Sequence, residues 1–178
     1  MSAPYWVDIF EEIVDDVRND TGKPATLDTD EPFYMYGHPK EIIKTLAKKD
    51  RHDVQKYNKY PIIALFQDFT ETMGEHQAVQ SRVEDLNIII ATNTSQDYTS
   101  AERYTKTFKP TLYPLYDLLI KHILKSKWFR NVDPGLVPHT KTDRVFWGRS
   151  DKNVFNDRLD AIEINNLTLE LRLKQNCR

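Results

Sequence analysis

The sequence predicts one α+β domain spanning residues 1–178, with a mixed, mostly antiparallel β-sheet and helices packed on it. Three observations carry this prediction: ordinary globular composition, apolar runs typical of β-strands, and amphipathic patterns with helical spacing. At 178 residues the chain can bury one core, and 39% hydrophobic with 29% charged residues is typical of a globular protein. The strand-like runs are residues 60–67, 85–92 and 167–173.

The first element is expected to be a helix over residues 5–19. Its apolar side chains recur at three- and four-residue spacing, and its acidic side chains face the other way. Asp20-Thr21-Gly22 ends the helix, and a polar loop follows. A short strand is predicted at 33–36, and His38-Pro39 then opens a second helix that ends in basic residues.

The sheet core is expected to begin at residues 60–67, where Pro61 indicates a strand start or a sheet edge. The polar insert 68–81 fits a protruding hairpin arm or a mobile loop. The run 85–92 has apolar residues on both faces near its end, which favours a central strand.

The second half of the chain predicts a long helix, a loop-rich segment and a closing strand. Thr99 and Glu102 form a possible capping box, and Pro110 and Pro114 predict a kinked or split helix that covers one sheet face and ends near Ser126. Residues 127–156 are loop-rich, with a possible short strand at 144–147. In the closing strand the apolar phase changes at Asn165-Asn166, which favours a β-bulge over a tight turn.

Charge is distributed unevenly, although the net charge is only −2. Nine acidic residues lie between Asp8 and Glu31, and seven basic residues lie between Lys40 and Lys59. This asymmetry fits either head-to-tail self-association or two solvated faces. The single Cys177 cannot form an internal disulfide, and neither a signal peptide nor a membrane span is recognised, so we expect folding in the cytoplasm without a membrane.

No catalytic or cofactor motif is found, and we expect no cofactor, no metal and no enzymatic activity. Asp160 and Glu163 with Arg158 resemble part of a metal-dependent nuclease cluster, but the lysine that such a cluster needs is missing. Among the histidines, His38 is expected to orient backbone donors at its helix start and His139 to lie in a loop. The other three, expected to be exposed to solvent, are His52, His76 and His122.

The aromatic and basic side chains allow two interpretations. They could form a basic groove that stacks single-stranded nucleic acid, or they could serve the core and a protein interface. The acidic first helix and the negative net charge favour the second. The basic candidates are Arg103, Lys106, Lys109, Lys121, Lys125, Lys127 and Arg130, and the aromatic ones are Tyr34, Tyr36, Tyr57, Tyr60, Tyr98, Tyr104, Tyr113, Tyr116, Trp128 and Trp147.

The order of elements resembles that of the tail-terminator and tail-completion proteins of tailed bacteriophages, which form rings at the head–tail junction. The matching segments are the Tyr60-Pro61-Ile62-Ile63 strand with its polar arm, the strand from Asp85 to Ser95, and the helix from Arg103 to Leu119. The resemblance covers about two-thirds of the chain. It implies a structural virion protein, assembled in the host bacterial cytoplasm, that joins portal-side and tail-side components.

The resemblance also implies partners: copies of this chain in a ring of roughly six or twelve, and other neck, portal or tail proteins. DNA would pass through the lumen without specific binding. The expected contact residues are Asp68, Thr70, Glu71, Glu75, His76 and Gln77 of the arm, Glu11, Glu12 and Asp15 of the first helix, and Lys44 and Lys48 of the second. The alternatives are a nucleic-acid-binding module, a metal-dependent nuclease and a non-viral protein-interaction domain.

Overall fold

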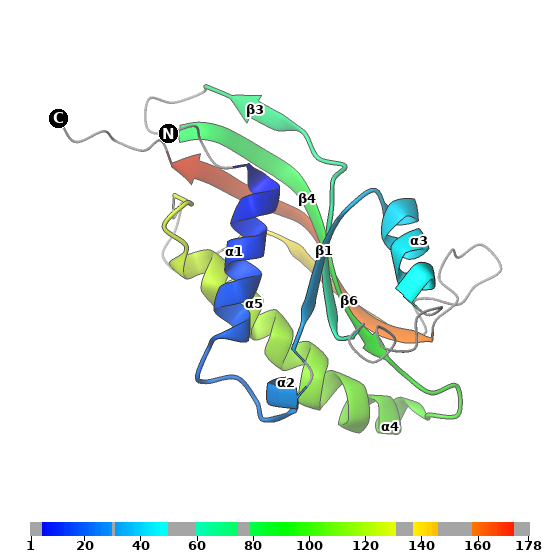
Figure 1. The fold of residues 1–178 in the computed structure, drawn as a ribbon. Coiled ribbons are helices and arrows are strands. Elements are labelled where there is room, and N and C mark those ends of the chain that lie inside the picture. The colour runs from blue at the N-terminus through cyan, green and yellow to red at the C-terminus, as the bar shows by residue number, and fades with distance from the viewer. Residues whose placement is uncertain are drawn as a thin grey trace.

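Six strands form one sheet with helices on both faces (Figure 1). The computed structural model describes residues 5–29, 31–49, 60–74, 79–130, 137–145 and 158–172. The helices are α1 Trp6–Arg18, α2 Thr26–Thr29, α3 Pro39–Lys49, α4 Ser100–Arg103, η1 Tyr104–Leu112 and α5 Tyr113–Lys125. The strands are β1 Phe33–Gly37, β2 Ile62–Phe66, β3 Glu71–Met73, β4 Val79–Asn93, β5 Thr140–Arg144 and β6 Leu159–Arg172.

The strand order is β1-β2-β4-β6-β5, and β3 pairs with β4 alone. Among the described strands, only β1 and β2 run parallel, joined by the crossover helix α3, and the other pairs are antiparallel. The predicted α+β class with a mixed, mostly antiparallel sheet is therefore confirmed. The central position of β4 is confirmed too, because β2 and β6 flank it, and Pro61 directly precedes β2 as a strand-start residue.

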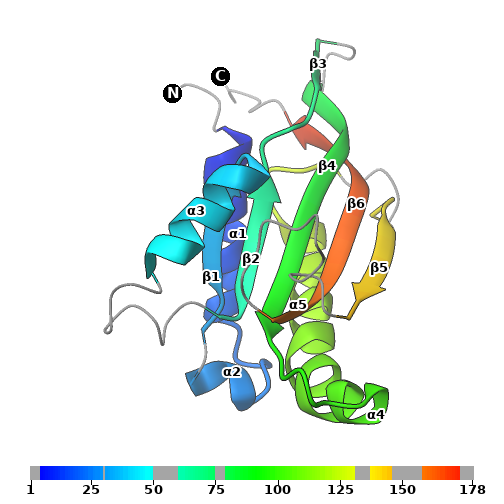
Figure 2. The same ribbon diagram turned by 90° about the vertical axis from the view of Figure 1, so that its right-hand side faces the viewer.

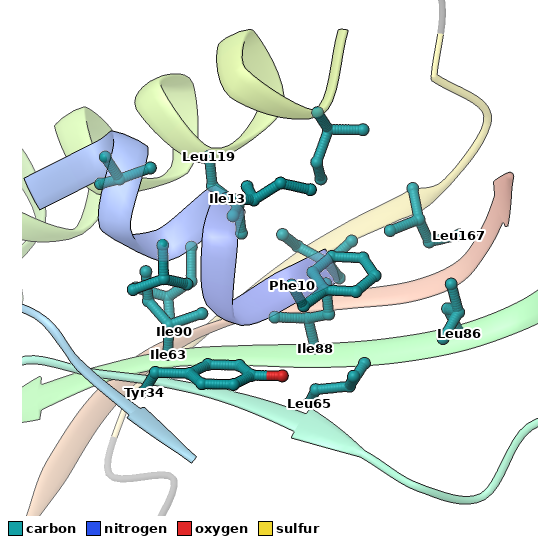
Figure 3. Close-up of a cluster of buried hydrophobic side chains, with 14 of the residues drawn as sticks. Phe10, Ile13, Tyr34, Ile63, Leu65, Leu86, Ile88, Ile90, Leu119 and Leu167 are labelled. Carbon is teal, nitrogen blue, oxygen red and sulfur yellow. The ribbon is translucent and has the colours of Figure 1, made fainter. Parts of the chain in front are cut away.

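The larger core lies between the sheet and the layer formed by α1 and α5 (Figure 3). Phe10 and Ile13 of α1 and Leu119 of α5 pack there over Ile88 and Ile90 of β4. On the opposite face, α3 places Ile42 and Leu46 over a smaller cluster that includes Ile89. Alternate residues of β4 thus enter different cores, which explains why its sequence is apolar on both faces.

The long helical segment is split into α4, η1 and α5 and ends at Lys125, in agreement with the predicted kinked or split helix that ends near Ser126. The capping box is confirmed: the Thr99 hydroxyl accepts the Glu102 N–H at 3.3 Å, and Glu102 Oε2 accepts the Thr99 N–H at 2.9 Å. Beyond α4 the backbone widens into the π-helix η1, which contains Pro110, before returning to α-helix at Tyr113. In an α-helix the ring of Pro110 would clash with the carbonyl four residues earlier, and the wider π spacing accommodates it.

The change of phase in the last strand is a β-bulge, as predicted. Leu86 pairs with Leu167 and Ile88 with Ile164, so three residue steps on β6 oppose two on β4. Asn166 takes up the extra step with a left-handed φ of 56°. Its N–H donates to Asn87 Oδ1 at 3.3 Å, which ties the bulge to the neighbouring strand.

Two local predictions were wrong. The loop expected after α1 contains the short helix α2, and the strand expected at 144–147 lies earlier, at β5. Arg144 ends β5 and Val145 follows in a bend, whereas Phe146 and Trp147 lie outside the described residues. The segment 140–144 has no apolar alternation because four of its five residues are exposed on an edge strand.

Candidate interaction surfaces

The polar insert forms an arm at one end of the sheet. β3 pairs antiparallel with β4 from Glu71↔Val83 to Met73↔Ser81, beyond the stretch of β4 that pairs with β2. All three β3 residues are exposed, and Met73 exposes 64% of its surface. Figure 2 shows the arm at the end of the molecule opposite α4. Of the two alternatives, the antiparallel pairing of β3 with β4 favours the hairpin arm.

The base of the arm is fixed to the domain. The Thr70 N–H donates to Asp85 Oδ1 at 3.1 Å, and the ring of Phe69 packs edge-on against Trp6 with 6.4 Å between centroids. Asp68, Thr70 and Glu71 are exposed, as a contact surface requires. The other predicted arm contacts lie outside the described residues: Glu75, His76 and Gln77.

The acidic surface of α1 carries five carboxylates and one arginine. Glu12 accepts hydrogen bonds from Lys127 Nζ at 2.6 Å and from Trp128 Nε1 at 2.8 Å, and the bond from Lys127 is the main cause of its lowered pKa. Asp15 pairs with Arg18 at 2.5 Å. Glu11 is exposed and has no ion pair within the described part of the chain. Of the three predicted contacts on α1, Glu11 is therefore the one best able to pair with a partner.

The basic surface lies on α3, which carries four lysines and one glutamate. Lys40 and Lys44 are exposed, and the side chain of Lys48 lies outside the described residues. Figure 2 shows α1 and α3 on opposite faces of the sheet. Their charged surfaces therefore point in different directions. Both helices flank β1 at the same side of the molecule.

A buried polar network joins the long helix to β6. Arg103 and Asp160 are 2% and 0% exposed, and Arg103 Nη1 donates to Asp160 Oδ1 at 3.0 Å. The same guanidinium donates to Thr94 Oγ1 and to the Ser95 carbonyl, each at 2.7 Å. The Thr107 hydroxyl donates to Asp160 Oδ2 at 2.8 Å. Arg103, a candidate of the nucleic-acid interpretation, is therefore not on a basic surface: it pairs with a buried carboxylate.

The residues of the nuclease interpretation are not brought together. Asp160 lies with the helix η1 on one sheet face, whereas Glu163, three residues later on the same strand, points to the other face. Glu163 accepts a hydrogen bond from Arg144 Nε at 2.9 Å, and Arg158 is exposed. Among the described residues, no group of three acidic, histidine or cysteine side chains could hold a metal ion.

A second charged cluster connects the turn after α1 to α5. Asp20 accepts hydrogen bonds from Lys121, from the Gly22 N–H at 2.8 Å and from His122 Nε2 at 2.7 Å. These bonds hold the pKa of Asp20 far below its usual value, and the bond from Lys121 has the largest effect. The side chain of His122 is only 14% exposed, so its predicted exposure was wrong.

The other histidines agree with the sequence where they are described. His38 Nδ1 accepts the Lys40 N–H at 3.2 Å, which confirms its role at the start of α3. His139 lies in the segment before β5, 2.7 Å from the hydroxyl of Tyr116 and 2.6 Å from the carbonyl of Val137. His52 and His76 lie outside the described residues.

The basic groove of the nucleic-acid interpretation is partly neutralised, because several of its basic side chains pair with carboxylates. Lys106 pairs with Glu102 at 3.2 Å, Lys121 with Asp20, and Lys127 with Glu12. Of the aromatic candidates, Tyr34 is buried in the core, and Tyr113 bonds through its hydroxyl to Asp143 at 2.8 Å. Tyr57 and Trp147 lie outside the described residues.

Comparison with known proteins found no relative of this chain. No protein-family model matches the chain, and neither a curated protein nor a solved structure matches it. In the described part of the chain, no helix is long and apolar enough to cross a membrane. The charged helix surfaces and the arm are therefore the features from which a function can be argued.

Proposed function

We propose that this chain is a structural subunit that assembles with copies of itself into a ring. The observation that carries the proposal is the placement of an acidic helix surface on α1 and a basic one on α3, on opposite faces of one sheet. The α1 surface of one copy is then complementary to the α3 surface of the next.

The arrangement favours a head-to-tail contact over a two-fold one. In a two-fold contact between α1 surfaces, carboxylate would meet carboxylate, and between α3 surfaces lysine would meet lysine. A contact between unlike surfaces avoids this repulsion. Such heterologous contacts leave a free surface at each end, and a ring forms when their rotation closes.

The arm provides a second contact with a neighbouring subunit or with another protein of the assembly. Its strand β3 is exposed throughout, while Thr70 and Phe69 fix its base to the domain. A fixed arm loses less conformational entropy on binding than a free loop of the same length. Among its described residues, Asp68 and Glu71 are exposed charged groups.

The place of this ring in a particle comes from the resemblance in the sequence. We propose the head–tail junction of a tailed bacteriophage, where the ring joins portal-side and tail-side components in the virion. The pairing of Lys106, Lys121 and Lys127 with carboxylates of the same chain supports a lumen that DNA passes without specific binding.

A charge exchange between the two helices tests the contact. Glu11→Lys or Lys44→Glu alone places like charges in the interface and should shift the chain toward monomers, because repulsion replaces attraction. The double variant carrying both substitutions restores unlike charges and should recover the assembly. Light scattering at low ionic strength measures the mass of each variant.

The matched control is Asp117→Lys, which reverses an exposed carboxylate on α5 and should leave the assembly unchanged. If each single variant assembles as the wild type does, the contact between α1 and α3 is refuted.

A further inference from the structure

Strand β1 is an edge of the sheet: within the described part of the chain, no strand pairs with the side of β1 that faces away from β2. The Phe33 N–H donates to the Pro61 carbonyl at 2.8 Å, and the Gly37 carbonyl accepts the Gln67 N–H at 3.1 Å. In a parallel ladder the N–H and C=O of one residue point to the same side, and this side alternates along the strand. The main-chain groups of Tyr34 and Tyr36 therefore point away from β2.

This edge lacks the protection that the other two edges have. Charged side chains on an edge strand discourage pairing with another chain, and β3 carries Glu71 while β5 carries Lys141, Asp143 and Arg144. The sequence of β1, Phe-Tyr-Met-Tyr-Gly, contains no charge. The side chain of Tyr36 is 52% exposed beside the open backbone.

The open edge is bordered by carboxylates from both flanking helices. The Tyr34 hydroxyl donates to the Val7 carbonyl, which lies on α1, at 3.1 Å. Burial is the main cause of the raised pKa of Tyr34, the negative charge of Glu11 is the next, and the charge of Asp8 contributes less. On the α3 side, Glu41 lies close to the end of β1: its Oε2 would be 3.3 Å from a Cβ atom placed on Gly37.

These border carboxylates are available to a ligand. Asp8, Glu11 and Glu41 are exposed, and none of the three forms an ion pair within the described residues. By contrast, Glu12 and Asp15, on the same helix α1, are already paired. On the α1 side, the charge of Asp8 and Glu11 is thus unmatched by the described side chains, whereas Glu41 shares α3 with the exposed Lys40 and Lys44.

We propose that the outer edge of β1 binds an extended, lysine- or arginine-bearing segment of another protein by strand addition. Main-chain hydrogen bonds to Tyr34 and Tyr36 provide affinity, and the basic side chains of the segment meet Glu11, Asp8 and Glu41. The proposal does not require a ring, because its main-chain contacts use a sheet edge. Glu11 is nevertheless shared with the proposed contact between α1 and α3, so a bound segment and a neighbouring copy would compete for it.

A second copy of β1 does not fit this edge. Two β1 strands joined across a two-fold axis would pair antiparallel with equal faces aligned, so that one α1 would lie beside the other. Glu11 and Asp8 would then face the same carboxylates of the partner across the new pair, which is unfavourable. A separate, basic segment satisfies both the backbone and the charge.

Titration of the full chain with a synthetic peptide of lysine and valine that places lysines on both faces of the added strand tests the proposal. The expected result is a change in the amide NMR signals of Tyr34 and Tyr36, with slower hydrogen exchange at both. Two control peptides keep the same charge. In one the odd-numbered residues carry N-methyl groups, and in the other the even-numbered residues carry them. Only the peptide methylated at the residues whose N–H groups point toward β1 should fail to bind, because it has lost the donors that pair with this strand.

A matched pair of variants separates the charge from the fold. Glu11→Gln should weaken the peptide about two- to fivefold, and Asp117→Asn, also an exposed carboxylate on a helix, should leave the affinity unchanged. Equal binding of all three peptides, signal changes that miss β1, or association of two copies through β1 would each overturn the proposal.

Discussion

At the scale of single residues, the pair Arg103–Asp160 has the largest expected effect on stability. Both side chains are buried, so Asp160→Asn would remove a buried countercharge of the guanidinium and should lower the free energy of unfolding by about 3–5 kcal/mol. Urea unfolding followed by circular dichroism measures this change.

The control for that substitution is Glu84→Gln, which removes a carboxylate 65% exposed and 2.6 Å from Arg82. Because this pair is largely solvated, the loss should stay below about 1 kcal/mol. If Asp160→Asn and Glu84→Gln lowered the free energy of unfolding equally, burial would not determine how much an ion pair contributes to stability.

Asp20 gives a prediction that depends on pH. Its folded-state pKa lies below its unfolded value, so its bonds to Lys121 and His122 stabilise the fold fully above about pH 4, and this stabilisation is lost as the pH falls toward the folded pKa. Asp20→Asn should therefore be less stable than the wild type at pH 7, and the difference should shrink below pH 4.

Urea unfolding at a series of pH values measures this trend. In Asp117→Asn, which removes an exposed carboxylate, stability should follow the wild type throughout. A difference between Asp20→Asn and the wild type that stays constant from pH 7 to about pH 2 would contradict the account.

At the scale of elements, the bulge in β6 depends on one left-handed residue. Asn166 has a φ of 56°, which glycine adopts without strain and β-branched residues resist. Asn166→Gly should be close to neutral, whereas Asn166→Val should cost about 1–2 kcal/mol. Thermal unfolding compares them, with Asn165→Val as the neighbouring control outside the left-handed region. If Asn165→Val cost more than Asn166→Val, the conformational explanation would fail.

The elements that could be predicted from the sequence are those with a clear period. Helix α1, strand β4 and the bulge at Asn166 follow from apolar spacing that the core imposes directly. Strand β5 could not be predicted, since its residues are exposed and its position is set by pairing with β6. The π-helix η1 was missed because proline indicates only a disturbed helix and not the form that the disturbance takes.

At the scale of the whole molecule, the sequence indicated the two charged regions but not which of their side chains are already paired within the chain. The acidic and basic runs could be read from composition, whereas the pairing of Glu12 with Lys127 depends on residues 115 positions apart. The burial of Arg103 against Asp160 likewise depends on residues far apart in the sequence, here 57 positions. The open edge of β1 also requires the strand order, which the pattern of a single strand does not contain.

The contact between unlike helix surfaces predicts an assembly that responds to salt. Screening weakens attraction between exposed charges, with a Debye length of about 10 Å at 0.1 M salt and about 3 Å at 1 M. The average mass in solution should therefore fall as ionic strength rises, and analytical ultracentrifugation measures it. An assembly that grows or stays constant with salt would indicate an apolar contact instead.

The central claim, that this chain forms a closed ring, is tested most directly by native mass spectrometry of the purified wild-type chain at low ionic strength, with negative-stain electron microscopy of the same sample. The account predicts a single oligomeric mass, a whole multiple of 21.0 kDa, and ring-shaped particles. A monomer at every concentration, or a two-fold dimer that does not grow further, would contradict it.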